Sequence, residues 1–297
     1  MKKMTISKLK KILCSLGLEI KNKAVSFVAF KNQEDGEEYA VWRVNIEGVS
    51  YVLKEAKPKE VETYLTFFRE SIAAVPTLYR WGEVEGVWYI LMEYIAGETV
   101  LGLNRHTLTL ALDALIDLQK RFWGKEEPKG CPLPFQATWE SRVKRGEYLG
   151  NALLEEAYSV FLTAYGSLAH TLCHDDLLPF NVMVTAERAV LVDWEFGGIL
   201  PYLTSIARLL AHGEDSENAF FFLKNEDKDF AIEYYYDHLV KNMGIAYNTY
   251  RKDLDCFFFY ELCEWVMLGQ KYGNTESERY KRYLALAKEM AKKILQQ

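Results

Sequence analysis

The sequence has few cysteines, and they form no recognisable metal-binding or disulfide pattern. The five cysteines, at positions 14, 131, 173, 256 and 263, are odd in number and scattered, without a C-x-x-C pair. We therefore expect reduced thiols in a cytoplasmic protein rather than a disulfide framework or a cysteine zinc site. Cys173 lies beside the motif described below, and we expect it to be a small buried apolar residue rather than a nucleophile.

The chain also lacks a basic cluster and a long apolar run. Its formal net charge of −6 argues against nucleic acid as the main partner, because phosphate contacts favour a basic surface. The apolar run at residues 12–18 is too short for a signal peptide or a membrane span, and the apolar spacing over residues 6–16 predicts an amphipathic helix. We therefore expect neither a nucleic-acid nor a membrane partner.

The 297 residues, 49% of them hydrophobic, suffice for one large or two moderate domains. The pattern changes near residue 95. Strand-like runs precede it, at residues 24–30, 38–46, 49–54, 78–83 and 87–94. Helical patterns follow it, most clearly at residues 106–122, 151–170 and 252–271. This order predicts a bilobal α+β fold, with a small antiparallel-sheet N-lobe over residues 1–95 and a larger, mostly helical C-lobe over residues 96–297.

One stretch spaces two carboxylates and a carboxamide as a phosphoryl-transfer site needs them. Residues 173–181 read CHDDLLPFN, and Asp193 follows twelve residues after Asn181. Such a site needs a group that orients the attacking hydroxyl, which Asp176 fits, and oxygen ligands for magnesium, which Asn181 and Asp193 fit. Residues 181–184 and 189–193 read as the strands of a hairpin, which would bring Asp193 back beside Asn181.

The pattern H-x-D-x-x-x-x-N followed by D-W-E resembles that of the aminoglycoside phosphotransferase and choline kinase family, a branch of the protein-kinase-like fold. The residues of the two segments, CHDDLLPFN and LVDWE, most resemble those of bacterial choline kinases. The resemblance implies an enzyme that uses ATP or GTP with Mg²⁺ to phosphorylate a small-molecule hydroxyl, with the nucleotide bound between the lobes. It also implies that His174 fixes the catalytic loop by hydrogen bonds. The alternative is a structural turn in which Asp and Asn cap backbone groups.

The resemblance further implies a first-lobe lysine that reaches the nucleotide phosphates and a helix acid that holds it. Lys54, at the end of a strand pattern, is the candidate lysine. Glu60 and Glu62 are both candidate partners and point to nearly opposite sides of the following helix. We favour Glu60, because it shares a stripe with Tyr64 and Phe67 that we expect to pack on the sheet.

Residues 90–97 resemble the hinge of the family, an apolar strand that runs into a glycine-containing turn. Extended backbone there would face the adenine edge, with Met92 and Ile95 flanking the base and Glu93 in the same nucleotide-binding segment. The expected phosphate loop departs from the family, because residues 31–38 carry four acids and a single glycine. This acidity leaves open a nucleotide-binding protein of the same fold without turnover.

A second alternative is a metal phosphohydrolase of the His-Asp type, suggested by His170 and by His174 with Asp175. Pro179 and the β-rich hairpin argue against the helix that such a site requires. The histidines at 106, 212 and 238 form no metal-ligand spacing.

The acceptor of the phosphoryl group is predicted to be a small molecule. After Asp193 the chain passes through Trp194-Glu195 almost directly into a helical pattern at residues 203–210, without the long peptide-docking segment of a protein kinase. Where family members commonly place an Asp before an Ile/Leu-Ala-Arg helix, this chain has Ser205.

Three residues of a later helix suit a cationic acceptor. Glu261 and Glu264 lie on one helix face beside Trp265, which would favour choline, ethanolamine or an aminoglycoside by charge and cation–π contact. A sugar-like alcohol is a further candidate, and Glu195 is a further contact residue. Alternatively, the aromatic residues are core and the acids form a solvated face.

Overall fold

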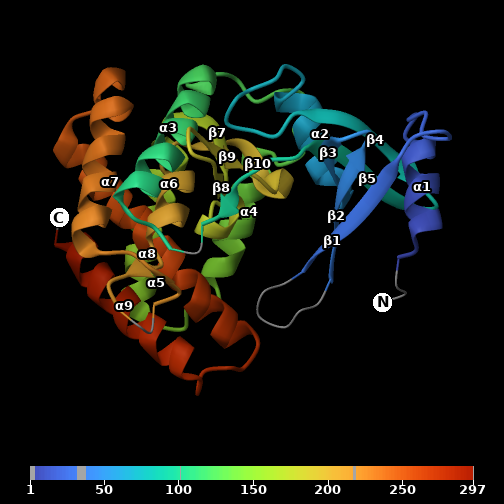
Figure 1. Cartoon of the computed structure of the whole chain (residues 1–297). Coiled ribbons are helices and arrows are strands. Elements are labelled where there is room, and N and C mark those ends of the chain that lie inside the picture. The colour runs from blue at the N-terminus through green and yellow to red at the C-terminus, as the bar shows by residue number, and fades with distance from the viewer. Residues whose placement is uncertain (1–3, 32–37, 101, 217–218, 297) are drawn as a thin grey trace.

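The computed structural model describes residues 4–31, 38–100, 102–216 and 219–296, and it consists of a small β-rich part beside a larger helical part (Figure 1). The β-rich part is a five-stranded antiparallel sheet in the order β1-β2-β3-β5-β4. Its strands are β1 (Val25–Lys31), β2 (Glu38–Ile46), β3 (Val49–Ala56), β4 (Leu78–Val84) and β5 (Val87–Glu93). Each matches a predicted strand to within two residues. Most of the expected phosphate loop, residues 32–37, lies outside the described residues.

The outer face of this sheet is covered by α1 (Ile6–Ser15), at the edge of the molecule farthest from the helical part (Figure 1). The helix begins at Thr5, whose side chain accepts a hydrogen bond from the Lys8 amide. Its buried residues Leu9 and Leu13 pack in one cluster with Leu53 of β3. The amphipathic helix predicted from the apolar spacing is therefore confirmed.

The inner face of the sheet is partly covered by α2 (Pro58–Phe67), which begins at its proline as the sequence suggests. The expectation that Tyr64 and Phe67 pack on the sheet is wrong. Both belong to the large core of the helical part, whereas Val61 packs against Ile90 and Met92 of β5. The helix lies between two layers and buries a different side against each one, so one apolar stripe could not identify the neighbour.

Helices form most of the second part and frame its core. The helices are α3 (Arg105–Phe122), α4 (Phe135–Gly146), α5 (Ala152–Ser167), α6 (Leu203–Leu210), α7 (Asn225–His238), α8 (Tyr247–Lys271) and α9 (Glu278–Leu295). β7 (His170–His174) pairs antiparallel with β10 (Gly197–Pro201). The helix predicted over residues 151–170 is therefore too long, because the chain turns extended at Leu168 to enter β7. Within the described ranges, no helix is long and apolar enough to cross a membrane.

The remaining short elements surround the motif. β8 (Val182–Val184) pairs with β9 (Ala189–Leu191) to form the predicted hairpin, and β6 (Glu98–Thr99) adds to its other side. Along the chain, the 3₁₀ turn η1 (Pro179–Asn181) precedes this hairpin and the 3₁₀ turn η2 (Trp194–Phe196) follows it. The other short elements are η3 (Val240–Met243) and the parallel pair β11 (Gly213–Glu214) and β12 (Phe221–Phe222).

Candidate functional site

His174 ends β7 and ties together three segments around the motif. Its side chain is fully buried, and its ring Nδ1 accepts a hydrogen bond from the Asp176 amide at 3.2 Å. The opposite nitrogen, Nε2, therefore carries the hydrogen and donates it to the Val192 carbonyl at 2.9 Å. Burial lowers the pKa of His174, which favours the neutral ring that these two bonds require. Such contacts suit the predicted role of fixing the loop.

The hairpin brings Asn181 and Asp193 together, as the sequence predicts. The Val192 amide donates to the Asn181 carbonyl at 2.9 Å, which joins the two ends of the hairpin just before Asp193. The Asn181 Nδ2 atom donates to the Asp176 carbonyl at 2.7 Å, so its Oδ1 atom is left for a ligand. Asp193 has a left-handed backbone, with φ 64° and ψ 59°, and 49% of its side chain is exposed.

Lys54 links the β-rich part to this hairpin. Its Nζ atom lies 2.8 Å from the Glu60 carboxylate and 2.8 Å from Asp193 Oδ1. Burial alone would lower the pKa of Lys54, but the carboxylates of Glu60 and Asp193 outweigh this effect and raise it. Burial also raises the pKa of Glu60, although Lys54 opposes that shift. Glu62, the other candidate partner, is exposed.

The residues predicted to form the hinge lie where β5 leaves the sheet. Met92 and Ile95 are buried, and Met92 belongs to the inner-face cluster of the sheet. The Glu93 carboxylate accepts hydrogen bonds from the Thr77 amide at 3.2 Å and from Arg188 at 2.7 Å. Its side chain is thus held toward the hairpin turn.

The sequence did not identify two arginines that anchor the residues after His174. Arg142 of α4 is 3% exposed and forms an ion pair with Asp175. Arg208 of α6 donates to Asp176 Oδ1 from Nη2 at 2.8 Å and from Nε at 3.2 Å. Spacing could not reveal either contact, because each joins the loop to a separate helix.

Ser205 also has a structural partner. Its Oγ atom accepts the hydrogen bond of the His174 backbone amide at 2.9 Å, so it fixes the start of the motif as a neutral acceptor. In the sequence this position stood out only as a departure from the family pattern, which did not reveal its contact with His174. Cys173, beside it, is buried, and burial raises the pKa of its thiol to about 12, which disfavours a nucleophilic thiolate.

The acids predicted for a cationic acceptor already have cationic partners within the chain. Arg208 Nη1 lies 2.8 Å from Glu261 and 2.9 Å from Glu264, which confirms that both acids point to one side of α8. Glu264 also contacts Arg145, and the guanidinium of Arg279 lies 4.7 Å from the centre of the Trp265 ring. Two further acid contacts complete this description: Glu195 lies 3.6 Å from Lys57, and Glu261 lies 3.5 Å from His212.

The charge and oxygen pattern around Asn181 and Asp193 suits a magnesium ion. In the described part of the chain, no group of three or more His, Cys, Asp and Glu side chains is placed to hold a metal. Magnesium typically takes one or two protein oxygens and completes its shell with water and substrate phosphates. The open Asn181 Oδ1 and the half-exposed Asp193 carboxylate fit that requirement.

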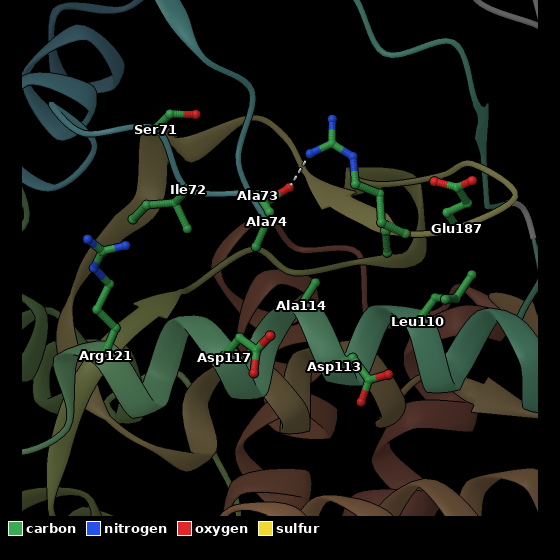
Figure 2. A pocket seen from close by; sticks show the side chains of 12 residues that line it. Ser71, Ile72, Ala73, Ala74, Leu110, Asp113, Ala114, Asp117, Arg121 and Glu187 are labelled. Carbon is green, nitrogen blue, oxygen red and sulfur yellow. Dashed lines mark hydrogen bonds between the residues drawn. The ribbon is translucent and has the colours of Figure 1, made fainter.

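A cavity of about 420 Å³ lies on another side of the hairpin, between α3, residues 71–74 and the β8–β9 turn (Figure 2). Asp113 and Asp117 of α3 line it, and Arg188 at the turn donates to the Ala73 carbonyl at 2.8 Å. The residues that line it include none of those predicted for the chemistry. The convergence of Lys54 with the motif therefore places the candidate site elsewhere.

Comparison with known proteins agrees with this geometry. A model of the phosphotransferase enzyme family matches residues 29–234. The protein LicA of Haemophilus influenzae is 26% identical over 125 residues, which cover 42% of this chain and 43% of LicA. The chain thus matches less than half the length of this curated relative.

Solved structures resemble the whole chain. Choline kinase from Cryptosporidium parvum is 14% identical, with a TM-score of 0.61 over 98% of this chain and 97% of that one. Amicoumacin kinase hAmiN, solved with AMP-PNP and Ca²⁺, is 14% identical, with a TM-score of 0.58 over 97% of this chain and 94% of that one. At this identity the likeness shows the fold, and the predicted bilobal protein-kinase-like fold is confirmed. With more than half of its length matched by the family model, the chain belongs to the phosphotransferase enzyme family, as the resemblance of its motif predicted.

Proposed function

We propose that the protein transfers the terminal phosphoryl group of ATP or GTP to a hydroxyl group of a small molecule, with Mg²⁺ as the cofactor. One observation carries this proposal. The Lys54 Nζ atom lies 2.8 Å from Asp193 Oδ1, at the open end of the hairpin where Asn181 also lies, and Asn181 Nδ2 donates to the Asp176 carbonyl. Phosphate-binding, metal-binding and hydroxyl-orienting groups thus converge from both parts of the fold.

Each side chain has a role in this proposal. Asp176 orients or deprotonates the acceptor hydroxyl, and Asn181 with Asp193 would hold Mg²⁺, which neutralises charge on the phosphates when bound. Lys54 binds phosphate oxygens, and Glu60, at 2.8 Å, fixes the position of its ammonium group.

The adenine or guanine base lies at the hinge in this proposal. Met92 and Ile95 flank the base, and Glu93 belongs to the same segment. The ion pair between Glu93 and Arg188 at 2.7 Å joins this segment to the hairpin turn. This ion pair supports a nucleotide-binding segment whose conformation is already set before the nucleotide binds.

The acceptor is a choline-like or ethanolamine-like amine, an aminoglycoside or a sugar-like alcohol. Among the proposed contact residues, the side chains of Glu195 and Glu264 are 26% and 20% exposed, so both can reach a ligand, and Trp265 lies beside Glu264. Glu261, predicted as a contact residue, is instead buried, with a side chain that is 4% exposed and paired with Arg208. The described cysteines are all free thiols, which supports the proposed cytoplasmic location.

The experiment that tests this function compares the wild type with Asp176→Asn in phosphate transfer from Mg-ATP and Mg-GTP. The acceptors are choline, ethanolamine, an aminoglycoside set and sugar alcohols. We expect the wild type to transfer phosphate to at least one acceptor and Asp176→Asn to lose about 100-fold or more of that rate, because the base that orients the hydroxyl is gone.

A thermal-shift measurement with Mg-ATP accompanies the assay. We expect Asp176→Asn to keep the stabilisation by nucleotide, and the exposed control Asp237→Asn to behave as the wild type in both measurements. Equal background transfer by wild type and Asp176→Asn, with nucleotide still bound, would instead favour a nucleotide-binding protein without turnover. The absence of any shift with nucleotide would contradict the kinase proposal itself.

A further inference from the structure

Arg208 combines an unusual set of contacts next to the proposed catalytic carboxylate. Two of its nitrogens, Nη2 and Nε, donate to the same oxygen of Asp176, Oδ1, at 2.8 and 3.2 Å. Its third nitrogen, Nη1, donates to Glu261 at 2.8 Å and to Glu264 at 2.9 Å. One guanidinium group of α6 thus joins the catalytic loop to α8.

We propose that Arg208 is a positioning residue that fixes the orientation of the Asp176 carboxylate, an inference that rests on the proposed function. With Oδ1 held by two hydrogen bonds, the other oxygen, Oδ2, is the one left for the acceptor hydroxyl. Within the described residues, Oδ2 has a single long contact, 3.5 Å from Asn181 Nδ2. The final torsion of an Asp side chain is broad, so a carboxylate that is 35% exposed needs such a restraint to present one oxygen.

Arg208 is itself held firmly enough to act in this way. Its side chain is 18% exposed, and its two glutamate partners approach from α8 on the side opposite Asp176. Glu261 is buried beside His212, and Glu264 also accepts hydrogen bonds from Arg145 and from the Tyr260 hydroxyl. These partners fix the guanidinium plane, and through it the plane of the Asp176 carboxylate.

Charge alone would not give this arrangement. A guanidinium group presents five N–H donors in a rigid fork, whereas a lysine ammonium group is a compact charge with three rotatable donors. Arg208 uses its nitrogens in two directions at once, toward Asp176 and toward the α8 acids. A lysine at this position keeps a positive charge near the acids but cannot hold Oδ1 with two bonds while it pairs with both glutamates.

The test uses variants that keep the buried charges balanced. Arg208→Met alone would leave Glu261 as a buried and less compensated charge, so it is combined with Glu261→Gln and compared with Glu261→Gln alone. Arg208→Lys is the conservative variant. Arg121→Met, which removes an exposed ion pair with Glu70, is the matched control outside the site.

The readouts are kcat and KM for Mg-ATP with the acceptor that gives the fastest transfer, or with water as acceptor through basal ATP hydrolysis. We expect Arg208→Met/Glu261→Gln to lose about 100-fold in kcat relative to Glu261→Gln, because a small misplacement of a reacting group is costly. The KM for Mg-ATP should stay within about 2-fold, since nucleotide contacts are untouched. The Tm of Arg208→Lys should be close to that of the wild type, but its kcat should be at least about 10-fold lower than that of the wild type.

Two results overturn the inference. One is a kcat of the double variant within about 2-fold of that of Glu261→Gln, and the other is a recovery of kcat by Arg208→Lys in proportion to its Tm. Asp176→Asn, measured in parallel, separates this failure from that of the proposed function. If Asp176→Asn loses activity while the Arg208 variants keep it, only the positioning role is wrong. If Asp176→Asn keeps the wild-type rate, the proposed function is wrong as well.

Discussion

Glu261 is a buried acid whose partners reverse the effect of burial. Burial alone would raise the pKa of this carboxyl, but Arg208 and His212 outweigh burial and lower the pKa below its ordinary value of 4.5. The native carboxylate therefore stays ionised at pH values at which the unfolded chain has already taken up a proton. The stabilisation that it provides is complete above about pH 4.5 and is lost as the pH falls toward the lowered native pKa.

This linkage makes a prediction for Glu261→Gln. We expect the variant to be about 3 kcal/mol less stable than the wild type at pH 7, because a buried ion pair loses one partner. The difference should shrink as the pH falls below about 4.5, since the wild type then loses the same charge. Urea unfolding between pH 7 and pH 3 measures it, with the exposed Glu278→Gln as the control that changes little at any pH. A difference that is constant with pH would contradict the assigned linkage.

The site residues that could be identified from the sequence are those brought together by a short stretch of chain. Asn181 and Asp193 meet because a short hairpin connects them, and strand alternation with a tight turn is readable from the chain. Arg208 and Glu264 lie 56 positions apart, on helices whose relative placement depends on the packed core. A helical pattern reveals which side chains share a face but not which element that face meets.

At the scale of elements, the same distinction holds for α2 and for the hinge. The position and first residue of α2 could be predicted from Pro58 and the helical pattern, whereas its burial between two layers could not. The hinge strand β5 could be predicted as well. What the pattern did not show is how closely Gly97 approaches the hairpin: a Cβ atom there would lie 2.9 Å from the Val184 carbonyl carbon.

We predict that Gly97→Ala displaces the hinge from β8. The added methyl group would collide with backbone rather than with a flexible side chain, so the segment must shift, at a cost of about 1–3 kcal/mol. The Tm and the Kd for Mg-ATP measure the effect, and we expect a lower Tm and weaker nucleotide binding. Gly102→Ala is the control, because its Cβ would meet the Phe222 carbonyl oxygen at an ordinary 3.6 Å. If both variants behave alike, the close approach does not set the shape of the hinge.

At the scale of the whole molecule, the β-rich and helical parts share a core at the end of α2. The centres of the Phe68 ring and of the Trp194 ring in η2 lie 4.8 Å apart, with the rings edge to face, and both side chains are buried. Phe68 and Tyr64 of the first part belong to the same cluster as the helices of the second. We therefore expect the two parts to unfold together rather than independently.

Phe68→Ala tests this coupling. We expect a loss of about 3–4 kcal/mol, because a buried ring at the junction is removed. Unfolding is monitored both by tryptophan fluorescence and by far-UV circular dichroism. The two transitions should coincide in the wild type and separate in Phe68→Ala. Tyr39→Ala, at a side chain that is 51% exposed, is the control and should cost less than about 1 kcal/mol. Coincident transitions in Phe68→Ala would show that the parts are coupled by other contacts.

The left-handed backbone of Asp193 restricts which amino acids this position tolerates during evolution. Bulky and β-branched residues are strongly disfavoured in that conformation, whereas glycine, asparagine and aspartate adopt it readily. Among these three, glycine lacks an oxygen on its side chain, and asparagine lacks the charge that faces Lys54. The shape of the chain and the chemistry of the site thus select the same residue for independent reasons.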